Sequence, residues 1–434
     1  MANPARPAEW KKAVADVMPH VNPDSLSISD LPSTESASEL TFAHFLCLRI
    51  LWKTYTSKRF KLDEYVDQVS AAKAAQRLET PKSKAFFDSV QQMHTGYPED
   101  SIFSLVRLYF DMVYKLDATM DISSLKVVLT PQPVRFGRHR EWIPESPLAR
   151  KGSPSRMDLD LDYSPPDKPS PAQARLAEEA RLAEELAAHH GASTPPTRAE
   201  SPVSDTSAHP DGSSPARPSE FSPTEDEIIV NMALLLLLNS LTEPEEALRA
   251  RGYRWIPNRE LLRILKSLPA GNAATTASGR NTAKYLEART DGCLRHTEHQ
   301  LAAALIEVKP CARSKKLGRI QWQEGAQMAA YIYKLLYLEK PPSSDFGLLR
   351  CRKAGVKRRL LVSQDHGEIY ITIAEYDSTY ERFLGLHHSA NPSGKISDTS
   401  FLKMHCYGPW NTKSKNDLRH VCRILMALSF YLAK

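Results

Sequence analysis

Asp291, Glu307 and Lys309 have the types and spacing that metal-dependent chemistry requires. Glu307 and Lys309 lie two positions apart at the end of an apolar run, so on a strand both side chains leave the same face. Asp291 lies in the preceding strand-like stretch. Two neighbouring carboxylates repel each other unless a cation neutralises them, and Mg²⁺ or Mn²⁺ takes oxygen ligands. A metal activates water, and a nearby lysine stabilises charge on phosphorus. The pattern predicts phosphodiester hydrolysis.

A second set of polar residues follows on the next predicted helix. Gln323, Gln327 and Tyr331 are spaced four apart and form one stripe on that helix. The loop before the helix is basic, and its cations are Arg313, Lys315, Lys316 and Arg319. Lysine and arginine contacts to phosphates supply most of the sequence-independent affinity for nucleic acids. We therefore expect this loop to bind nucleic acid.

These residues need a sheet to position them, and the C-terminal half has the elements of one. Ser222, Pro223 and Glu225 match the start of a helix, and an apolar run follows. The predicted strands are Thr282–Leu294, Leu301–Val308, Arg359–Ser363 and Glu368–Ala374, and further helices are Ile320–Leu338 and Leu418–Leu432. This order predicts an α/β fold with a mixed central sheet flanked by helices.

The strands that carry Asp291 and Glu307 must meet a condition of register. Both carboxylates have to face the same side of the sheet if they share a metal. A regular hairpin with a two-residue turn would place Asp291 opposite Ile306, and Glu307 would then face the wrong side. We therefore predict a bulge within Thr290 to Cys293, or an odd-length turn within Arg295 to Leu301. The carboxylates should then lie within roughly 5 Å of each other.

The N-terminal part has a different pattern. Glu39–Tyr55 and Asp100–Leu116 are apolar almost all the way round, which is typical of buried helices, and Lys61–Leu78 is a more polar helix between them. The pattern predicts a small all-helical domain over residues 1–130, an interaction or packing module that could bind a protein partner.

Residues 131–221 are rich in Pro, Ser and charged residues. Such a segment cannot bury enough apolar surface to offset its chain entropy, so we predict a disordered linker. Within it, the repeats RLAEEA and RLAEEL predict a short charged helix at Ala172–His190. The linker would separate the helical domain from a domain over residues 222–434.

Composition excludes several classes of protein. The formal net charge of +6 and the pI near 8.8 permit a polyanionic partner. The longest apolar run, Ile228 to Leu238, is too short to span a bilayer, and the first residues have no apolar signal region. The six cysteines show no CxxC spacing, so neither a zinc site nor a disulfide framework is indicated. We expect an intracellular protein, nuclear or cytoplasmic, that is neither secreted nor bound to a membrane.

Six segments in order carry a resemblance to a known superfamily. They are EDEIIVNMALLLLLNSL, YLEARTDGCLR, ALIEVKPCARS, IQWQEGAQMAAYI, RRLLVSQDHGEIYITIAEYD and FLKMHCYGPW. Together they resemble the PD-(D/E)XK nuclease superfamily, and most closely the nuclease-like proteins found in many copies in filamentous fungi. The resemblance covers about half of the chain, from Ser222 to the end, and implies a restriction-endonuclease-like fold there.

The resemblance also implies roles for single residues. Asp291 and Glu307 match the metal-binding acids, and Lys309 matches the catalytic lysine. Gln327 and Tyr331 look like the glutamine and tyrosine of nucleases of the bacterial recombination type, with Gln327 at the catalytic centre and Tyr331 at the nucleic acid. In the first helix Glu227 resembles an additional metal-binding acid, for which Glu225 and Asp226 compete. The implied cofactor is Mg²⁺ or Mn²⁺, and the favoured partner is DNA rather than RNA. One departure is Thr290, where the superfamily has proline.

Structural alternatives remain at each of these positions. Glu307 and Lys309 could form an ion pair at a strand end, and the fold could be an inert module that binds nucleic acid or protein. Glu287 shares the strand face of Asp291 but could simply pair with Arg295. Two histidines, His296 and His299, are expected to be solvated in a turn, and Trp322 is expected in the core rather than stacked on a base.

Overall fold

The computed structural model describes residues 3–28, 37–91, 103–116, 225–242, 248, 251–267, 282–339, 341–385 and 400–434. All of them lie in one compact unit that residues 1–127 and 221–434 form together. The predicted linker over residues 131–221, with its charged helix at Ala172–His190, lies outside the described residues.

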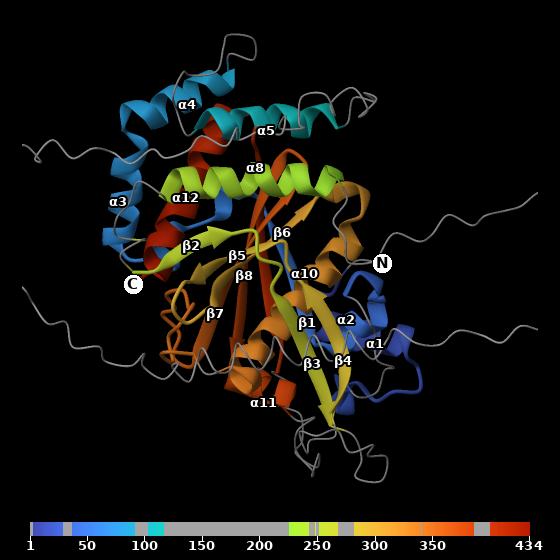
Figure 1. The fold of residues 1–434 in the computed structure, drawn as a ribbon. Helices are drawn as coiled ribbons and strands as arrows, with labels where there is room; N and C mark the ends of the chain where they lie inside the picture. The colour runs from blue at the N-terminus through green and yellow to red at the C-terminus, as the bar shows by residue number, and fades with distance from the viewer. Residues whose placement is uncertain are drawn as a thin grey trace, which may run out of the picture. The chain divides into compact units, whose positions relative to one another are not determined.

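A mixed seven-stranded sheet forms the centre of this unit, in the order β1-β9-β8-β7-β6-β5-β2 (Figure 1). Its strands are β1 (Ile50–Tyr55), β2 (Tyr253–Ile256), β5 (Gly292–His296), β6 (Ala302–Lys309), β7 (Val356–Asp365), β8 (Glu368–Asp377) and β9 (Leu402–Asn411). The pairs β1–β9 and β6–β7 are parallel, and the other neighbours are antiparallel. Two further strands, β3 (Leu261–Ser267) and β4 (Thr282–Arg289), form a separate antiparallel pair. The predicted α/β class with a mixed sheet is confirmed.

Helices cover both faces of the sheet. They are α1 (Pro7–Val17), α2 (Phe42–Cys47), α3 (Gln68–Leu78), α4 (Pro81–Gln91), α5 (Phe103–Lys115), α8 (Glu225–Thr242), α10 (Leu317–Tyr333), α11 (Ser378–Gly385) and α12 (Lys415–Leu432). One core joins Ile306 and Val308 of β6 to α3, α4, α5, α8 and α12. The other joins Leu305 to α1, α2, α10 and α11. This division follows the alternation of side chains along the strand. No helix among the described residues is long and apolar enough to cross a membrane.

Strand β6, which carries Glu307 and Lys309, lies between β7 and β5 inside the sheet. Every residue from Ala302 to Val308 is buried, as expected for a strand that is covered on both faces. Lys309, at its end, is partly exposed. Charged side chains are costly inside a buried strand, and the two charged residues of β6, Glu307 and Lys309, lie near its C-terminal end.

The prediction of a separate all-helical domain over residues 1–130 is wrong. Only Phe42–Cys47 of the predicted helix Glu39–Tyr55 is helical, and Arg49 then adopts a positive φ of 51°. The rest becomes β1, which pairs with β9 and completes the sheet. The short apolar run Ile50-Leu51-Trp52, buried in β1, fits a strand as well as a buried helix, so its periodicity could not separate the two.

Other boundaries differ in smaller ways. The predicted strand Thr282–Leu294 is divided at Thr290 and Asp291 into β4 and β5, which belong to different sheets. The predicted helix Ile320–Leu338 ends as α10 at Tyr333, and a short π-helix over Lys334–Leu338 follows. The predicted strands around the Asp365-His366-Gly367 turn are confirmed as β7 and β8.

Candidate active site

The register between β5 and β6 brings Asp291 and Glu307 to the same face. Gly292 is paired with Ile306, so the next position places Asp291 opposite Glu307. The register shifts between Leu294 and Arg295, where Ala303 is the extra residue. The required irregularity is therefore present, but Ala303 lies outside both places that the sequence analysis named, Thr290–Cys293 for a bulge and Arg295–Leu301 for an odd-length turn.

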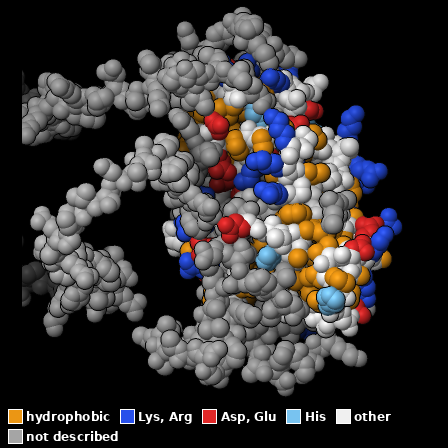
Figure 2. All heavy atoms as spheres, turned by 90° about the vertical axis from the view of Figure 1, so that its right-hand side faces the viewer, with side chains coloured by type: hydrophobic (Ala, Val, Ile, Leu, Met, Phe, Trp, Pro, Cys, Tyr) orange, Lys and Arg blue, Asp and Glu red, His pale blue; other side chains and the backbone are white. Residues whose placement is uncertain are grey.

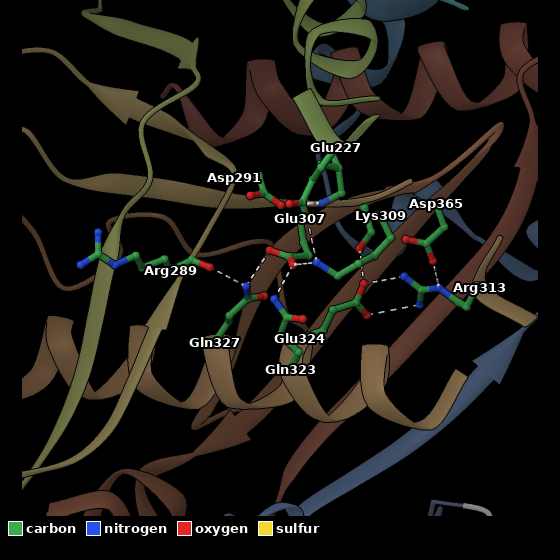
Figure 3. Close-up of polar contacts among 12 residues, drawn as sticks. Glu227, Arg289, Asp291, Glu307, Lys309, Arg313, Gln323, Glu324, Gln327 and Asp365 are labelled. Atoms are coloured by element: carbon green, nitrogen blue, oxygen red, sulfur yellow. Dashed lines mark hydrogen bonds and ion pairs between the residues drawn. The ribbon is translucent and has the colours of Figure 1, made fainter. Parts of the chain in front are cut away.

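Both oxygens of the Glu307 carboxylate accept hydrogen bonds from neighbouring side chains (Figure 3). It is 1% exposed, and its Oε1 accepts hydrogen bonds from Lys309 Nζ at 2.5 Å and Gln323 Nε2 at 2.6 Å. Its Oε2 accepts from Gln327 Nε2 at 2.6 Å, and the same amide donates to the carbonyl of Arg289 at 2.8 Å. Both glutamines lie on α10, four residues apart, so one face of that helix fixes the carboxylate.

Asp291 is fixed by its backbone as well as its side chain. Its Oδ2 accepts the amide of Val308 at 2.9 Å, and its own amide donates to the carbonyl of Ile306 at 3.0 Å. Asn231 of α8 donates to the carbonyl of Asp291 at 2.8 Å. These three bonds hold the carboxylate, which is 5% exposed, beside the end of β6.

Lys309 joins the acid of the first helix to the strand. Its Nζ lies 2.5 Å from Glu307 and 3.2 Å from Glu227, which enters the site from α8. Glu227, in the first turn of α8, therefore reaches the site through this ion pair. The lysine and Glu227 keep 17% and 18% of their side chains exposed, so the site opens to solvent on this side.

The electrostatics of the site disfavour its ionised carboxylates. Lys309 contacts Glu227 and Glu307, and the charges of Lys309 and Arg259 both act on the neighbouring Asp291. Burial, and then the charge of Asp291, raises the pKa of Glu307 well above its usual range. Burial also raises the pKa of Asp291, although Lys309 opposes it. Burial alone would lower the pKa of Lys309, but the carboxylates outweigh it and raise that pKa. The site therefore favours an additional positive charge, either protons or a cation.

The residues present fit a hydrated divalent cation such as Mg²⁺ or Mn²⁺. The donors of the cluster are carboxylate oxygens, which are hard ligands of the kind these ions prefer. Next to them, Gln327 Oε1 and Asn231 Oδ1 are buried acceptors without a hydrogen-bond donor among the described residues. Metal-bound water would supply donors to such oxygens. Glu227, Asp291 and Glu307 are the residues that would hold the ion.

A second charged cluster lies directly beside the site, and we call it the arginine cluster: Arg313, Glu324 and Asp365. Asp365 of β7 is the register partner of Lys309 in the parallel pair β6–β7. Arg313 forms ion pairs with Asp365 and, at 2.5 Å, with Glu324, and Ser363 donates to Glu324 at 2.6 Å. The guanidinium carbon of Arg313 lies 4.0 Å above the ring centre of Tyr370. This cluster ties the loop after β6 to α10 and β7.

The basic loop is only partly what the sequence predicted. Lys315, Lys316 and Arg319 are exposed around the start of α10, as expected of residues that could meet phosphates. Arg313, which was counted with them, is instead buried in the arginine cluster. Figure 2 views the side on which α8 and α10 begin, and Lys and Arg side chains gather there beside acidic and hydrophobic ones.

The assignment of Tyr331 to nucleic-acid binding is wrong. The side chain is 1% exposed, and its hydroxyl donates to the carbonyl of Ala302. The guanidinium of Arg359 lies 5.2 Å from its ring centre. The helical spacing placed Tyr331 correctly on the face of Gln323 and Gln327, but that face turns into the core one turn further along α10.

Other predicted contacts also changed. Glu287 pairs with Arg263 at 3.0 Å and Arg289 at 3.3 Å, not with Arg295, because β4 belongs to a different sheet from β5. His296, Glu298 and His299 lie close together in the β5–β6 turn, with one ligand atom of each within 4.8 Å of the others. Nδ1 of His296 already accepts two backbone amides there, which is a turn-forming role.

The sequence analysis missed two residues that support the site. Gln323 was placed on the stripe but not at the site, and Asn231 was not considered for it. A signal existed for Asn231, since it is a polar residue inside the apolar run of α8. Comparisons with family models, with curated proteins and with solved structures found no match for the chain.

Proposed function

We propose that the chain is a divalent-metal-dependent nuclease with a restriction-endonuclease-like fold, and that Glu227, Asp291, Glu307 and Lys309 form its active site. The observation that carries the proposal is the pair of buried, neighbouring carboxylates Asp291 and Glu307, whose pKa values burial raises, beside the partly exposed Lys309 and Glu227. Buried charges are normally paired, so two neighbouring carboxylates whose ionised forms burial disfavours would be stabilised by a bound cation.

Each residue has a definite task in this proposal. When bound, Mg²⁺ or Mn²⁺ supplies an activated water and offsets charge on the phosphate. Gln323 and Gln327 hold Glu307 in one orientation, and the amide of Val308 does the same for Asp291. Lys309 presents an ammonium group where negative charge develops on a phosphodiester. The exposed Lys315, Lys316 and Arg319 would bind the phosphates of a nucleic acid, with DNA favoured over RNA.

One observation favours a second candidate, an inert nuclease-fold module that binds nucleic acid or protein. Glu307 is almost fully buried, and both of its oxygens already accept hydrogen bonds. A metal would have to compete with Lys309 and Gln323 for Oε1. An inert module would keep the four side chains as an ion-pair network and would use only the basic loop.

The test is cleavage of a mixture of single- and double-stranded DNA and RNA, with Mg²⁺, Mn²⁺ or a chelator. The wild type should cut with metal and not with chelator, and Lys309→Ala should lose most of the activity. Thermal unfolding with and without Mn²⁺ gives a second readout, because a ligand that binds only the folded state stabilises it. A metal-dependent rise in Tm without cleavage, or neither effect, would favour the inert module.

A further inference from the structure

A separate cavity lies among α3, α4, α5, α8 and α12, the helices at the upper left of Figure 1. Its volume is about 360 Å³. Pockets for small molecules commonly span about 300–1,000 Å³, so it has room for a compact ligand. Its lining residues are Arg77, Thr80, Lys82, Ser83, Phe103, Ser240, Leu241 and Met426. None of them belongs to the candidate active site.

The lining has two chemically different parts. Phe103, Leu241 and Met426 form an apolar wall, and all three are buried. Arg77 and Lys82 bring cations to the cavity from the end of α3 and the start of α4. The hydroxyls of Thr80 and Ser83, joined by a hydrogen bond of 2.9 Å, lie between them. The arrangement is that of a pocket with an apolar body and a polar, cationic end.

The two cations at the cavity are Arg77 and Lys82, and within the described ranges neither of them forms an ion pair. Glu79, which lies between them in the sequence, is paired instead with Lys84 at 3.1 Å and with Arg419. Asp88, one turn further along α4, is paired with Lys415 at 2.5 Å. Among the described residues of α3 and α4, Glu79 and Asp88 are thus paired with cations other than Arg77 and Lys82.

We propose that this cavity binds a small organic anion, a carboxylate or a phosphate monoester that carries a short hydrocarbon or aromatic body. The apolar part packs against Phe103, Leu241 and Met426, where removal from water stabilises it. The anionic group meets Arg77 and Lys82, and charge-assisted hydrogen bonds to them fix its orientation. The ligand is independent of the metal chemistry at the strand ends.

The probe for the test is anilinonaphthalene sulfonate, an anion with an aromatic body that fluoresces when bound to an apolar surface. The full chain should bind it saturably at one site. The double variant Arg77→Gln with Lys82→Gln should bind about tenfold more weakly, because it loses two partly exposed charge contacts. Lys84→Gln, on the same helix but paired with Glu79, is the matched control and should bind as the wild type does. Equal affinity in the double variant would overturn the proposal.

Two further measurements keep the test decisive. Leu241→Phe adds volume at the apolar wall and should weaken probe binding, with circular dichroism as the check on folding. Competition with hexanoate, hexyl phosphate and hexanol then separates head groups. Displacement by hexanoate or hexyl phosphate, whichever is stronger, supports an anion site and identifies its head group. Displacement by hexanol at the same concentration would overturn it, because a neutral ligand gains nothing from the cations.

Discussion

Two clusters of charged residues lie side by side at the same end of strands β6 and β7, and their charges are compensated in different ways. In the candidate active site, Lys309 contacts the two carboxylates Glu227 and Glu307, and Lys309 and Glu227 keep 17% and 18% of their side chains exposed. In the arginine cluster, a guanidinium serves two carboxylates, and Arg313, Glu324 and Asp365 are 4%, 0% and 0% exposed. The register that pairs Lys309 with Asp365 makes the two clusters direct neighbours.

The difference teaches where excess charge is tolerated. The planar guanidinium of Arg313 contacts both acids at once, although burial raises the pKa of Asp365 to about 6. The compact ammonium group of Lys309 contacts Glu227 and Glu307, whereas Asp291 accepts its hydrogen bond from the backbone amide of Val308. A cluster that faces solvent can gain positive charge from a bound cation. A cluster that is closed to solvent has to obtain its positive charge from a side chain of the protein.

The largest effect should come from neutralising the acids of the site. Asp291→Asn and Glu307→Gln should each lower the cleavage rate on the order of 10³-fold, since metal-ion catalysis contributes several kcal/mol. The metal-free protein should not be destabilised, because the pKa of both acids is raised and the ionised form is unfavourable. Cleavage kinetics and urea unfolding of the same samples measure both effects. A variant that cuts at the wild-type rate would remove that residue from the site.

The arginine cluster should respond in the opposite way. Arg313→Met leaves Glu324 and Asp365 buried without their partner and should lower the free energy of unfolding by about 3–5 kcal/mol. Arg319→Met, at an exposed position in the first turn of α10, should change it by less than about 0.5 kcal/mol. Urea unfolding without metal compares the two. Equal stabilities would show that the buried ion pairs do not hold the loop.

The pH dependence should separate the empty site from the occupied one. Because the folded-state pKa of Glu307 is raised, its contribution to stability is present at low pH and is lost as pH rises through that pKa, above the usual 4.5. The free energy of unfolding of the metal-free protein should therefore fall as the pH rises from about 4.5 toward neutrality. The loss should be smaller in Glu307→Gln and with saturating Mn²⁺. The same loss in all three samples would assign it to another group, with Asp365 the first to examine.

The smallest effect concerns the basic loop. Lys315→Gln with Lys316→Gln should weaken nucleic-acid binding equally for all sequences and lower the slope of log K against log salt by about 0.9 for each lost phosphate contact. Lys61→Gln, an exposed lysine outside the loop, is the control. Fluorescence anisotropy at several salt concentrations gives the slope. An unchanged slope in the loop variant would mean that nucleic acid binds elsewhere.

The core of the site could be predicted from sequence because its geometry is local. Two-residue spacing put Glu307 and Lys309 on one face, and simple hairpin arithmetic required an irregularity before Asp291 could join them. The position of the bulge could not be predicted, because Ala303 looks like every other small apolar residue of β6. Gly292 has a different reason to be glycine: a Cβ there would lie 2.8 Å from the carbonyl oxygen of Ile256 on β2.

What depends on contacts between distant residues escaped the sequence. Arg313 looked like part of an exposed basic loop, because its partner Asp365 lies 52 residues away. Tyr331 matched a pattern, but its burial depends on how α10 packs against the sheet. The strand β1 was taken for a helix, since its partner β9 lies at the other end of the chain. Periodicity describes an element and does not say what covers it.

The pairing of β1 with β9 also has a consequence for synthesis of the chain. Tyr55 and His405, which contact each other across these strands, are separated by 350 residues. A ribosome that adds about 5–20 residues per second needs roughly 20–70 s to make that stretch. During this interval the nascent chain carries the apolar strand residues Ile50, Leu51 and Trp52 without their partner. We expect chaperones to hold this segment during translation, and we expect chains truncated before Leu402 to aggregate through it.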